Sequence, residues 1–421
     1  MSPSPPCNSA LRLRLLDAIL PNSLPANRRV CYILALRPRL RVANVPLRSV
    51  LTPPMAQNLT RPVVKRLVPY VPGRPAEEVA REFGLSDVLK LASNENPLGP
   101  SPLAIEAMQQ ALPDLRLYPD NSCRALMAEL ARRLDLPEDH LIVGRGSDEV
   151  IHMAGLAFLN PGEETIMGDP YFVLYHLTTM LMDARPIKVP LKNYRFDVEA
   201  VVGRITPATK LVFASSPNNP TGTIVTREEL ALLMERLPAH TILILDEAYG
   251  EYVTSPEYPD SLQYVRQGRN ILVLRTFSKI YALAGLRIGY GMACPDIIAA
   301  LHQVREPFNV SSLAQVAAVA SLRDPQQVAR STRLNEEGRR YLEGEFARLG
   351  LSFPPSQSNF VFVDLGVDAG AAFQSLMRRG VIVRYDPAFG MPTHVRVTIG
   401  TMEQNRRFIT ALEEVLAELR A

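Results

Sequence analysis

Cysteine is scarce in this chain, and its placement indicates neither a disulfide framework nor a metal site. The four cysteines, Cys7, Cys31, Cys123 and Cys294, are scattered along the sequence. They form no CxxC pair, so they fit a reducing compartment. The six histidines show no HxxxH spacing, and we therefore expect no metal centre.

Long apolar runs and a strong charge of one sign are missing as well. No run reaches the roughly 18 apolar residues of a membrane-spanning helix, so we expect no membrane partner. The 46 basic and 43 acidic residues leave a net charge of +3, which does not suggest a nucleic-acid partner. A length of 421 residues exceeds one ordinary core and predicts two domains.

The N-terminal segment differs in composition from the rest. Residues 1–54 hold eight arginines, nine prolines, no lysine and a single acid, Asp17. We predict a disordered Arg/Pro-rich extension over residues 1–58. One interpretation is a transit peptide for organelle import. The favoured interpretation is that translation truly starts at Met55 and that the preceding residues are an upstream-translated extension. We then expect the protein to be cytoplasmic.

Beyond residue 100, short apolar runs alternate with segments of helical period. The runs span residues 141–143, 165–167, 211–213, 242–245 and 271–274. This alternation predicts an α/β fold whose mostly parallel sheet carries helices on both faces. We assign residues 106–305 to this large domain. Shorter strands and a final amphipathic helix predict a smaller α+β domain over residues 306–421, with residues 59–105 as an arm packed against it.

Polar residues follow four of the expected strands directly. They are a glycine turn at residues 144–148, an Asn-rich loop at residues 216–222, Asp246 after residues 242–245, and Lys279 soon after residues 271–274. Because ligands bind beyond the carboxyl ends of parallel strands, these groups should share one rim of the sheet.

The chemistry of this rim suits pyridoxal 5′-phosphate. A buried carboxylate such as Asp246 needs a cation or several hydrogen-bond donors. Alternatively, Asp246 caps a helix or pairs with an arginine and has no role at a cofactor. Lys279 is either a solvated surface lysine or a nucleophile for an aldehyde. The glycine turn can cradle a phosphate. That cofactor needs a lysine, an acid opposite its ring nitrogen and an anion site.

The motifs that carry a family resemblance run from about residue 69 to the C-terminus. They lie at residues 69–73, 93–99, 118–120, 146–149, 216–222, 246–249, 278–287 and 395–400. With them the chain resembles the fold-type-I pyridoxal-phosphate aminotransferases, and within these the histidinol-phosphate aminotransferase branch. The resemblance implies an enzyme of histidine biosynthesis.

The resemblance also assigns roles to individual residues. Lys279 would bind the cofactor aldehyde and then act as general base, and Asp246 would pair with the ring nitrogen. Tyr249 and Asn219 would bind the phenolic oxygen, and Phe172 would stack on the ring. The phosphate would be surrounded by Ser147, Asp148, Thr276, Ser278 and Arg287. Tyr118 would reach the cofactor phosphate of a second subunit, which implies a homodimer.

The substrate side requires an anion clamp. The resemblance gives this role to Arg396, with Arg384, Tyr70, Asn96 and Asn359 as weaker candidates. The implied reaction transfers the amino group of L-histidinol phosphate to 2-oxoglutarate and yields L-glutamate. An aromatic amino acid aminotransferase and a phosphothreonine-type decarboxylase are the alternatives.

Overall fold

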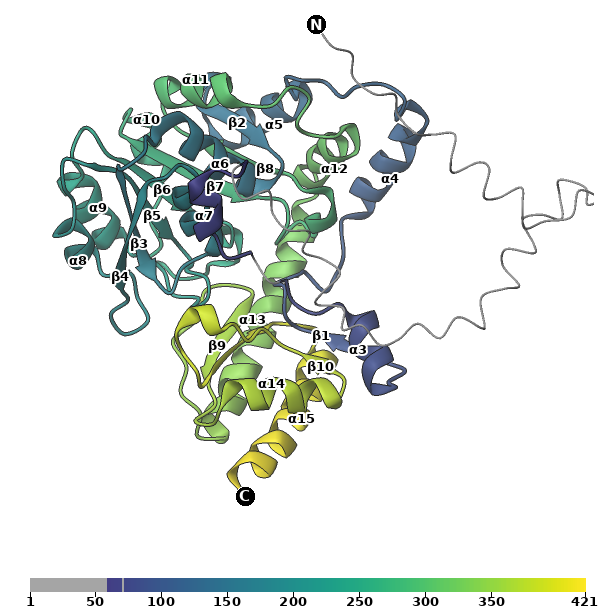
Figure 1. The fold of residues 1–421 in the computed structure, drawn as a ribbon. Helices are drawn as coiled ribbons and strands as arrows, with labels where there is room; N and C mark the ends of the chain where they lie inside the picture. The colour runs from purple at the N-terminus through teal and green to yellow at the C-terminus, as the bar shows by residue number, and fades with distance from the viewer. Residues whose placement is uncertain (1–58, 70–71) are drawn as a thin grey trace, which may run out of the picture. The chain divides into compact units, whose positions relative to one another are not determined.

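The structure is a computed structural model that describes residues 59–69 and 72–421. The extension expected over residues 1–58 and the candidate Tyr70 lie outside the described residues. Elements are labelled as in Figure 1, and the description concerns Pro62–Ala421.

A seven-stranded sheet with the order β2-β8-β7-β6-β5-β3-β4 forms the centre of the N-terminal part. Its strands are β2 (Leu141–Gly144), β3 (Glu164–Asp169), β4 (Arg185–Pro190), β5 (Thr209–Ser215), β6 (Ile242–Asp246), β7 (Ile271–Thr276) and β8 (Gly289–Met292). The pairs from β4 to β7 are parallel, and β8 runs antiparallel to both of its neighbours. The predicted α/β class with a mostly parallel sheet is therefore confirmed.

Helices cover both faces of this sheet because its strands are apolar on both sides. Along β5, Val212 joins one hydrophobic core while Leu211 and Phe213 join the other. The first core includes side chains of α4 (Pro102–Ala111), α5 (Arg124–Leu134), α8 (Val198–Val202), α9 (Arg227–Arg236), α10 (Leu262–Arg266) and α12 (Ser312–Leu322). The second includes side chains of α6 (Gly146–Phe158), α7 (Val173–Leu181) and α11 (Pro295–Val304). The two layers flank the strands in Figure 1.

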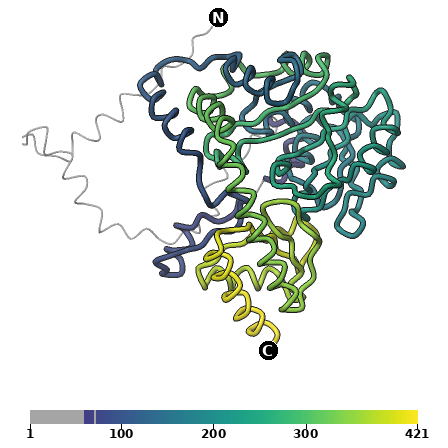
Figure 2. The backbone as a smooth tube through the Cα atoms, turned by 180° about the vertical axis from the view of Figure 1, so that it is seen from behind, coloured from purple at the N-terminus to yellow at the C-terminus, as the bar shows by residue number. Residues whose placement is uncertain are grey.

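The C-terminal part has a core of its own. Its strands β9 (Phe360–Asp364) and β11 (His394–Thr398) pair antiparallel. Their apolar side chains pack with α13 (Pro325–Arg348), α14 (Ala369–Arg378) and α15 (Met402–Arg420). Figure 2 shows this part, yellow-green to yellow, gathered at the C-terminal end of the chain trace.

The segment before α4 joins the C-terminal part through main-chain pairing. It contains α3 (Ala76–Phe83) and β1 (Leu89–Lys90), and β1 pairs parallel with β10 (Val381–Ile382). This is the kind of contact expected for an arm. The division at residues 59–105, 106–305 and 306–421 stays a prediction.

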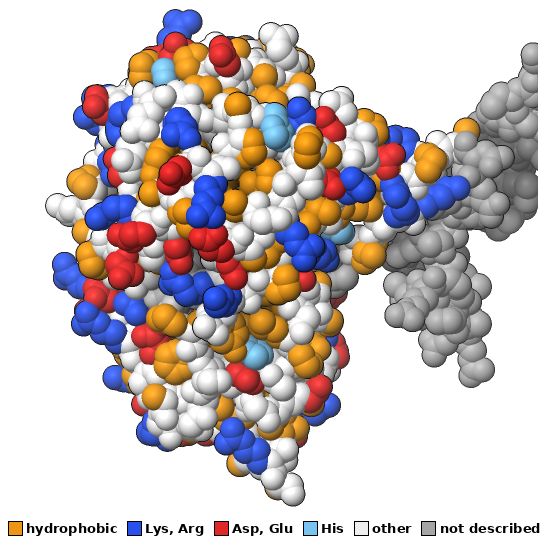
Figure 3. Space-filling model, turned by 90° about the vertical axis from the view of Figure 1, so that its left-hand side faces the viewer, with side chains coloured by type: hydrophobic (Ala, Val, Ile, Leu, Met, Phe, Trp, Pro, Cys, Tyr) orange, Lys and Arg blue, Asp and Glu red, His pale blue; other side chains and the backbone are white. Residues whose placement is uncertain are grey.

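The surface carries both signs of charge side by side. Figure 3 shows lysine and arginine interspersed with aspartate and glutamate on the face in view. Within the described residues, none of the helices combines the length and the apolar character of a membrane span.

Candidate active site

The candidate site lies at the carboxyl ends of β5, β6 and β7. Asp246 is the last residue of β6, and it pairs in register with Ser215 of β5 and Leu274 of β7. The loops that leave these strands therefore start at the same rim of the sheet. Lys279 follows β7 by three residues.

Asp246 is a buried carboxylate that is held by two neutral donors. The residue is 4% exposed. One oxygen accepts a hydrogen bond from the hydroxyl of Tyr175 at 2.8 Å, and the other accepts from the backbone N–H of Ala248 at 3.0 Å. Burial raises the pKa of Asp246 to about 6, although both donors act to lower it. A carboxylate held in this way can take up a cationic N–H group, which is the partner that a pyridine ring nitrogen would provide.

Tyr175 was not anticipated from the sequence, and it connects two of the expected site residues. Its ring stacks on Phe213 with centroids 4.8 Å apart and meets Phe172 edge-on at 5.6 Å. Its hydroxyl donates to Asp246. A single buried tyrosine thus contacts both the expected stacking residue and the expected acid. The available signal was its helical spacing from Phe172 across the first turn of α7.

Lys279 is half-buried, and its amine faces the Ser93 main chain and the Tyr249 ring. Nζ donates to the carbonyl oxygen of Ser93 at 3.1 Å and lies 5.6 Å from the centroid of the Tyr249 ring. Burial is the largest cause that lowers the pKa of Lys279 to about 8, and Arg396 lowers it further. A lysine with this pKa is partly deprotonated near neutral pH, as a nucleophile for an aldehyde must be.

Polar groups gather where α6 begins. Arg287 donates to a carboxylate oxygen of Asp148 at 2.7 Å and lies 3.4 Å from the hydroxyl of Ser278. The hydroxyl of Thr276 lies 3.0 Å from that of Ser278. Ser147 stands in the first turn of α6, where free N–H groups and the helix dipole attract anions. The five expected phosphate residues are therefore brought together.

A glycine makes this close arrangement possible. A Cβ atom at Gly289 of β8 would lie 2.4 Å from the backbone nitrogen of Ser147. Any side chain there would push the start of α6 away from the sheet. The fit of a phosphate group to these residues therefore rests on backbone geometry as well as on charge.

Tyr249 is held by a residue from the segment between β1 and α4. Asn94 donates from Nδ2 to the Tyr249 hydroxyl at 2.9 Å, and the carbonyl oxygen of Asn94 accepts from Nδ2 of Asn359 at 2.9 Å. Because the Tyr249 oxygen accepts this bond, its own hydrogen is available for a bound group. Asn94 has a positive φ of 56° and is 2% exposed. Its position in the expected motif at residues 93–99 was the available signal.

Arg396 belongs to β11 of the C-terminal part, and its side chain contacts the loop that follows β5. It donates from Nη1 to the side-chain oxygen of Asn219 at 2.6 Å and from Nη2 to the carbonyl oxygen of Ala92 at 2.7 Å. Its guanidinium carbon is 5.2 Å from the ring centroid of Phe360. Arg384 is its neighbour across an isolated β-bridge. Both arginines are therefore presented on the same side of the strands.

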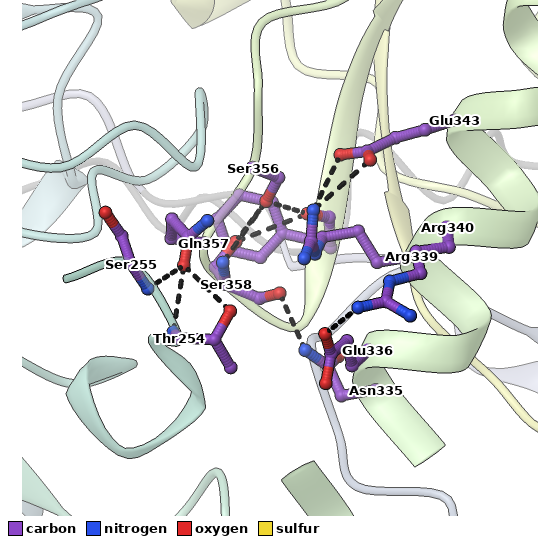
Figure 4. Close-up of polar contacts among 11 residues, drawn as sticks. Thr254, Ser255, Asn335, Glu336, Arg339, Arg340, Glu343, Ser356, Gln357 and Ser358 are labelled. Atoms are coloured by element: carbon purple, nitrogen blue, oxygen red, sulfur yellow. Dashed lines mark hydrogen bonds and ion pairs between the residues drawn. The ribbon is translucent and has the colours of Figure 1, made fainter. Parts of the chain in front are cut away.

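Figure 4 shows the segment before β9, with Ser356, Gln357 and Ser358, among residues of α13 and of the loop that contains Thr254 and Ser255. The side-chain oxygen of Gln357 accepts from the backbone N–H groups of Thr254 and Ser255 at 3.0 and 3.1 Å. Asn335 of α13 donates to the carbonyl oxygen of Ser358 at 3.1 Å. These bonds fix the segment before β9, and Asn359 follows immediately.

Two other expected residues lie differently. The side-chain nitrogen of Asn96 donates to the carbonyl oxygen of Ile280 and to the hydroxyl of Ser331, both at 2.8 Å, so its amide is engaged in the interior. Tyr118 is 82% exposed and stacks on Phe308 with centroids 4.8 Å apart. The expected role of Tyr118 concerns a second subunit. This role and that of Asn96 in the substrate pocket stay predictions.

Comparison with known proteins agrees with this geometry. Residues 86–412 match the family model described as "Aminotransferase class I and II". The chain belongs to this family of enzymes.

The relatives define the branch more narrowly. The histidinol-phosphate aminotransferase of Moorella thermoacetica is 51% identical over 358 residues, which cover 85% of this chain and 93% of the relative. That of Caldicellulosiruptor saccharolyticus is 44% identical over 356 residues, which cover 85% and 99%. The crystal structure of the Sinorhizobium meliloti histidinol-phosphate aminotransferase in complex with pyridoxal-5′-phosphate superposes with a TM-score of 0.79, at 28% identity and 86% and 98% coverage. The chain is a member of the histidinol-phosphate aminotransferase family, and the predicted family is confirmed.

Proposed function

We propose that this protein transfers the amino group of L-histidinol phosphate to 2-oxoglutarate, with pyridoxal 5′-phosphate as cofactor. The products are the corresponding imidazole-acetol phosphate and L-glutamate. The observation that carries the proposal is the placement of two groups at neighbouring strand ends: the buried carboxylate Asp246 ends β6, and the amine-bearing Lys279 follows β7 by three residues. Tyr249 follows Asp246 by three residues in the chain, and Nζ of Lys279 lies 5.6 Å from the centroid of the Tyr249 ring.

The residues present fit the cofactor group by group. When bound, pyridoxal 5′-phosphate supplies an aldehyde that holds the amino group and a ring that accepts an electron pair. Asp246 would hold the proton on the ring nitrogen, and Phe172 would lie against the ring. Tyr249 and Asn219 would donate to the phenolic oxygen. Ser147, Asp148, Thr276, Ser278 and Arg287 would surround the phosphate.

Lys279 is the residue we propose to move the proton. Its lowered pKa of about 8 means that a fraction of the amine is neutral near pH 7 and about half of it at pH 8. The carbonyl of Ser93, at 3.1 Å from Nζ, orients the amine. Lys279 therefore combines a suitable protonation state with a fixed direction.

The two arginines form the proposed anion site. Arg396 would bind the phosphate of histidinol phosphate and, in turn, a carboxylate of 2-oxoglutarate, because a planar guanidinium suits both anions. Arg384 would add a second positive charge beside it. Asn359 borders this region through its bond to Asn94. Roles for Tyr70 and Asn96 in this pocket are part of the proposal.

We further propose that the enzyme works as a homodimer in which Tyr118 reaches the partner's cofactor phosphate. Support comes from an unusual concentration of exposed apolar side chains in and after α4. These are Leu103, Ile105, Leu112, Leu115, Leu117 and Tyr118. Isolated apolar residues are normal on a surface, but a run of this length favours an interface.

Subunit mixing tests this arrangement. Tyr118→Ala and Lys279→Ala variants should each be nearly inactive. A hybrid dimer restores one complete site, so an equal mixture after subunit exchange should regain about a quarter of the wild-type activity. A mixture that stays inactive although hybrids form would contradict a shared site.

The substrate assignment is tested by coupled assays. Initial rates with histidinol phosphate and with phenylalanine, each with 2-oxoglutarate, should differ strongly in favour of histidinol phosphate. Comparable kcat/KM values for both donors would instead support the aromatic aminotransferase. The cytoplasmic location stays a prediction, because residues 1–54 lie outside the described part of the chain.

A further inference from the structure

We propose that Asp386 is a specificity-determining positioning residue. It offsets the charge of Arg384, so that one anion pocket accepts both a dianionic phosphate ester and a monoanionic carboxylate. This inference rests on the proposed function of that pocket. It concerns how two unlike substrates can use the same site in successive half-reactions.

The first observation is the geometry of the two arginines. The backbone N–H of Arg384 donates to the carbonyl of Arg396 at 2.9 Å, and the N–H of Arg396 donates back at 2.8 Å. Residues paired in this way present their side chains on the same face, with Cα atoms about 5.5 Å apart. An anion bound to Arg396 therefore lies within range of the charge on Arg384.

The second observation is that Asp386 forms an ion pair with Arg384 at this face. Nη2 of Arg384 contacts Oδ2 of Asp386 at 2.5 Å, and the two side chains are only 11% and 23% exposed. Arg396, by contrast, donates to two neutral oxygens, those of the Asn219 side chain and the Ala92 carbonyl. The negative charge of Asp386 therefore enters the pocket on the Arg384 side.

The third observation is that Asp386 is fixed in place. Its other oxygen, Oδ1, accepts from the backbone N–H of Ala388 at 3.1 Å and caps the short helix η7 (Pro387–Phe389). Phe389 packs edge-on against Phe362 of β9 with centroids 6.0 Å apart. The carboxylate is thus held by main chain and by packing, and its charge stays at the edge of the pocket.

The expected effect follows from Coulomb's law. At a separation of about 7 Å, one negative charge weakens the binding of a monoanion about threefold even at the bulk-water dielectric constant of about 80, and more at the value of about 20 near a protein surface; the factor for a dianion is the square of that for a monoanion. Asp386 therefore lowers the affinity for the phosphate ester far more than that for the carboxylate. The phosphate-bearing product is released more easily, and the carboxylate substrate can compete.

The test uses Asp386→Asn in the cofactor-loaded enzyme. The amide keeps an oxygen that can cap Ala388 and removes only the charge; Asp386→Ser serves as a second variant with a short acceptor. Calorimetry with sulfate gives the dianion affinity, and displacement of sulfate by acetate gives the monoanion affinity. Glu414→Gln is the matched control, because it removes a charge from an exposed ion pair between Arg379 and α15.

We expect both variants of Asp386 to bind both anions more tightly, with a factor for sulfate near the square of that for acetate. The KM for histidinol phosphate should fall more than the KM for 2-oxoglutarate. Equal factors for the two anions, weaker binding, or the same change in Glu414→Gln would overturn the inference. Failure of the proposed function would look different: the wild-type enzyme would not turn over histidinol phosphate, whereas the sulfate and acetate affinities would still report on Asp386.

Discussion

Replacement of Asp246 by asparagine should make the cofactor-free protein more stable and the enzyme less active. Burial raises the pKa of this carboxyl from 3.8 to about 6. Above pH 6 the native state therefore holds a charge that the unfolded chain accommodates more easily. The pKa difference corresponds to a cost on the order of 3 kcal/mol in the free energy of unfolding.

The sign of the pH dependence follows from linkage. Between about pH 4 and 6 the native protein binds more protons than the unfolded chain at this position, so this group's contribution to stability falls as pH rises. Asparagine carries no such penalty. The variant should therefore gain on the order of 3 kcal/mol at pH 8 and roughly half of that at pH 5.

The activity should change in the opposite direction. The neutral amide of the Asp246→Asn variant cannot hold a proton on the ring nitrogen by its charge. A hydrogen bond to a charged group contributes about 1.5–3 kcal/mol, so kcat should fall between about tenfold and 150-fold.

Urea unfolding of the cofactor-free wild type and variant at pH 8 and pH 5 measures the first effect, and steady-state rates measure the second. Glu414→Gln, which removes one carboxylate charge away from the candidate site, provides a charge-matched control. A variant that is less stable at pH 8, or a gain in stability that does not change with pH, would refute the reasoning about Asp246.

Three further results are expected. Lys279→Ala should lose the cofactor on denaturation after borohydride treatment, whereas the wild type should retain it covalently; cofactor retained by the variant would exclude Lys279 as the attachment point. Tyr175→Phe removes one charge-assisted donor to Asp246, so cofactor affinity measured by fluorescence should fall about tenfold or more, and unchanged affinity would contradict this contact. Gly222→Ala should destabilise the protein by about 2 kcal/mol or more, measured by urea unfolding. The reason is that Gly222 has a φ of +77° and that a Cβ there would lie 2.4 Å from the hydroxyl of Ser356. A loss of stability below about 0.5 kcal/mol would contradict this.

The sequence predicted those strands of the fold whose residues are continuously apolar. Strands β2, β3, β5, β6 and β7 contain the five runs that were expected. The edge strand β4, Arg185–Pro190, carries two prolines and two charges, so it has no such signature. The short β8, Gly289–Met292, contains two glycines, which lower strand propensity. Both strands form because neighbours in the folded sheet complete their hydrogen bonds.

The candidate site was predictable where a residue follows a strand and less so where the fold brings distant segments together. Asp246 and Lys279 stand at or soon after strand ends, so their positions could be inferred. The contacts of Asn94 and Tyr175 could not, because they join residues 155 and 71 positions apart along the chain. The pattern of apolar and polar residues within a short stretch of sequence does not show which distant residues meet in the fold.

The distribution of the site along the chain has a consequence for biosynthesis. Residues around the candidate rim come from Ser93 near the start of the described chain, from Asp246 and Lys279 in the middle, and from Arg396 close to the C-terminus. A ribosome-bound nascent polypeptide that still lacks β11 has no Arg396 beside Asn219. The anion site proposed for the substrates is therefore complete only once the C-terminal strand has been made, and translation products truncated before β11 should lack it.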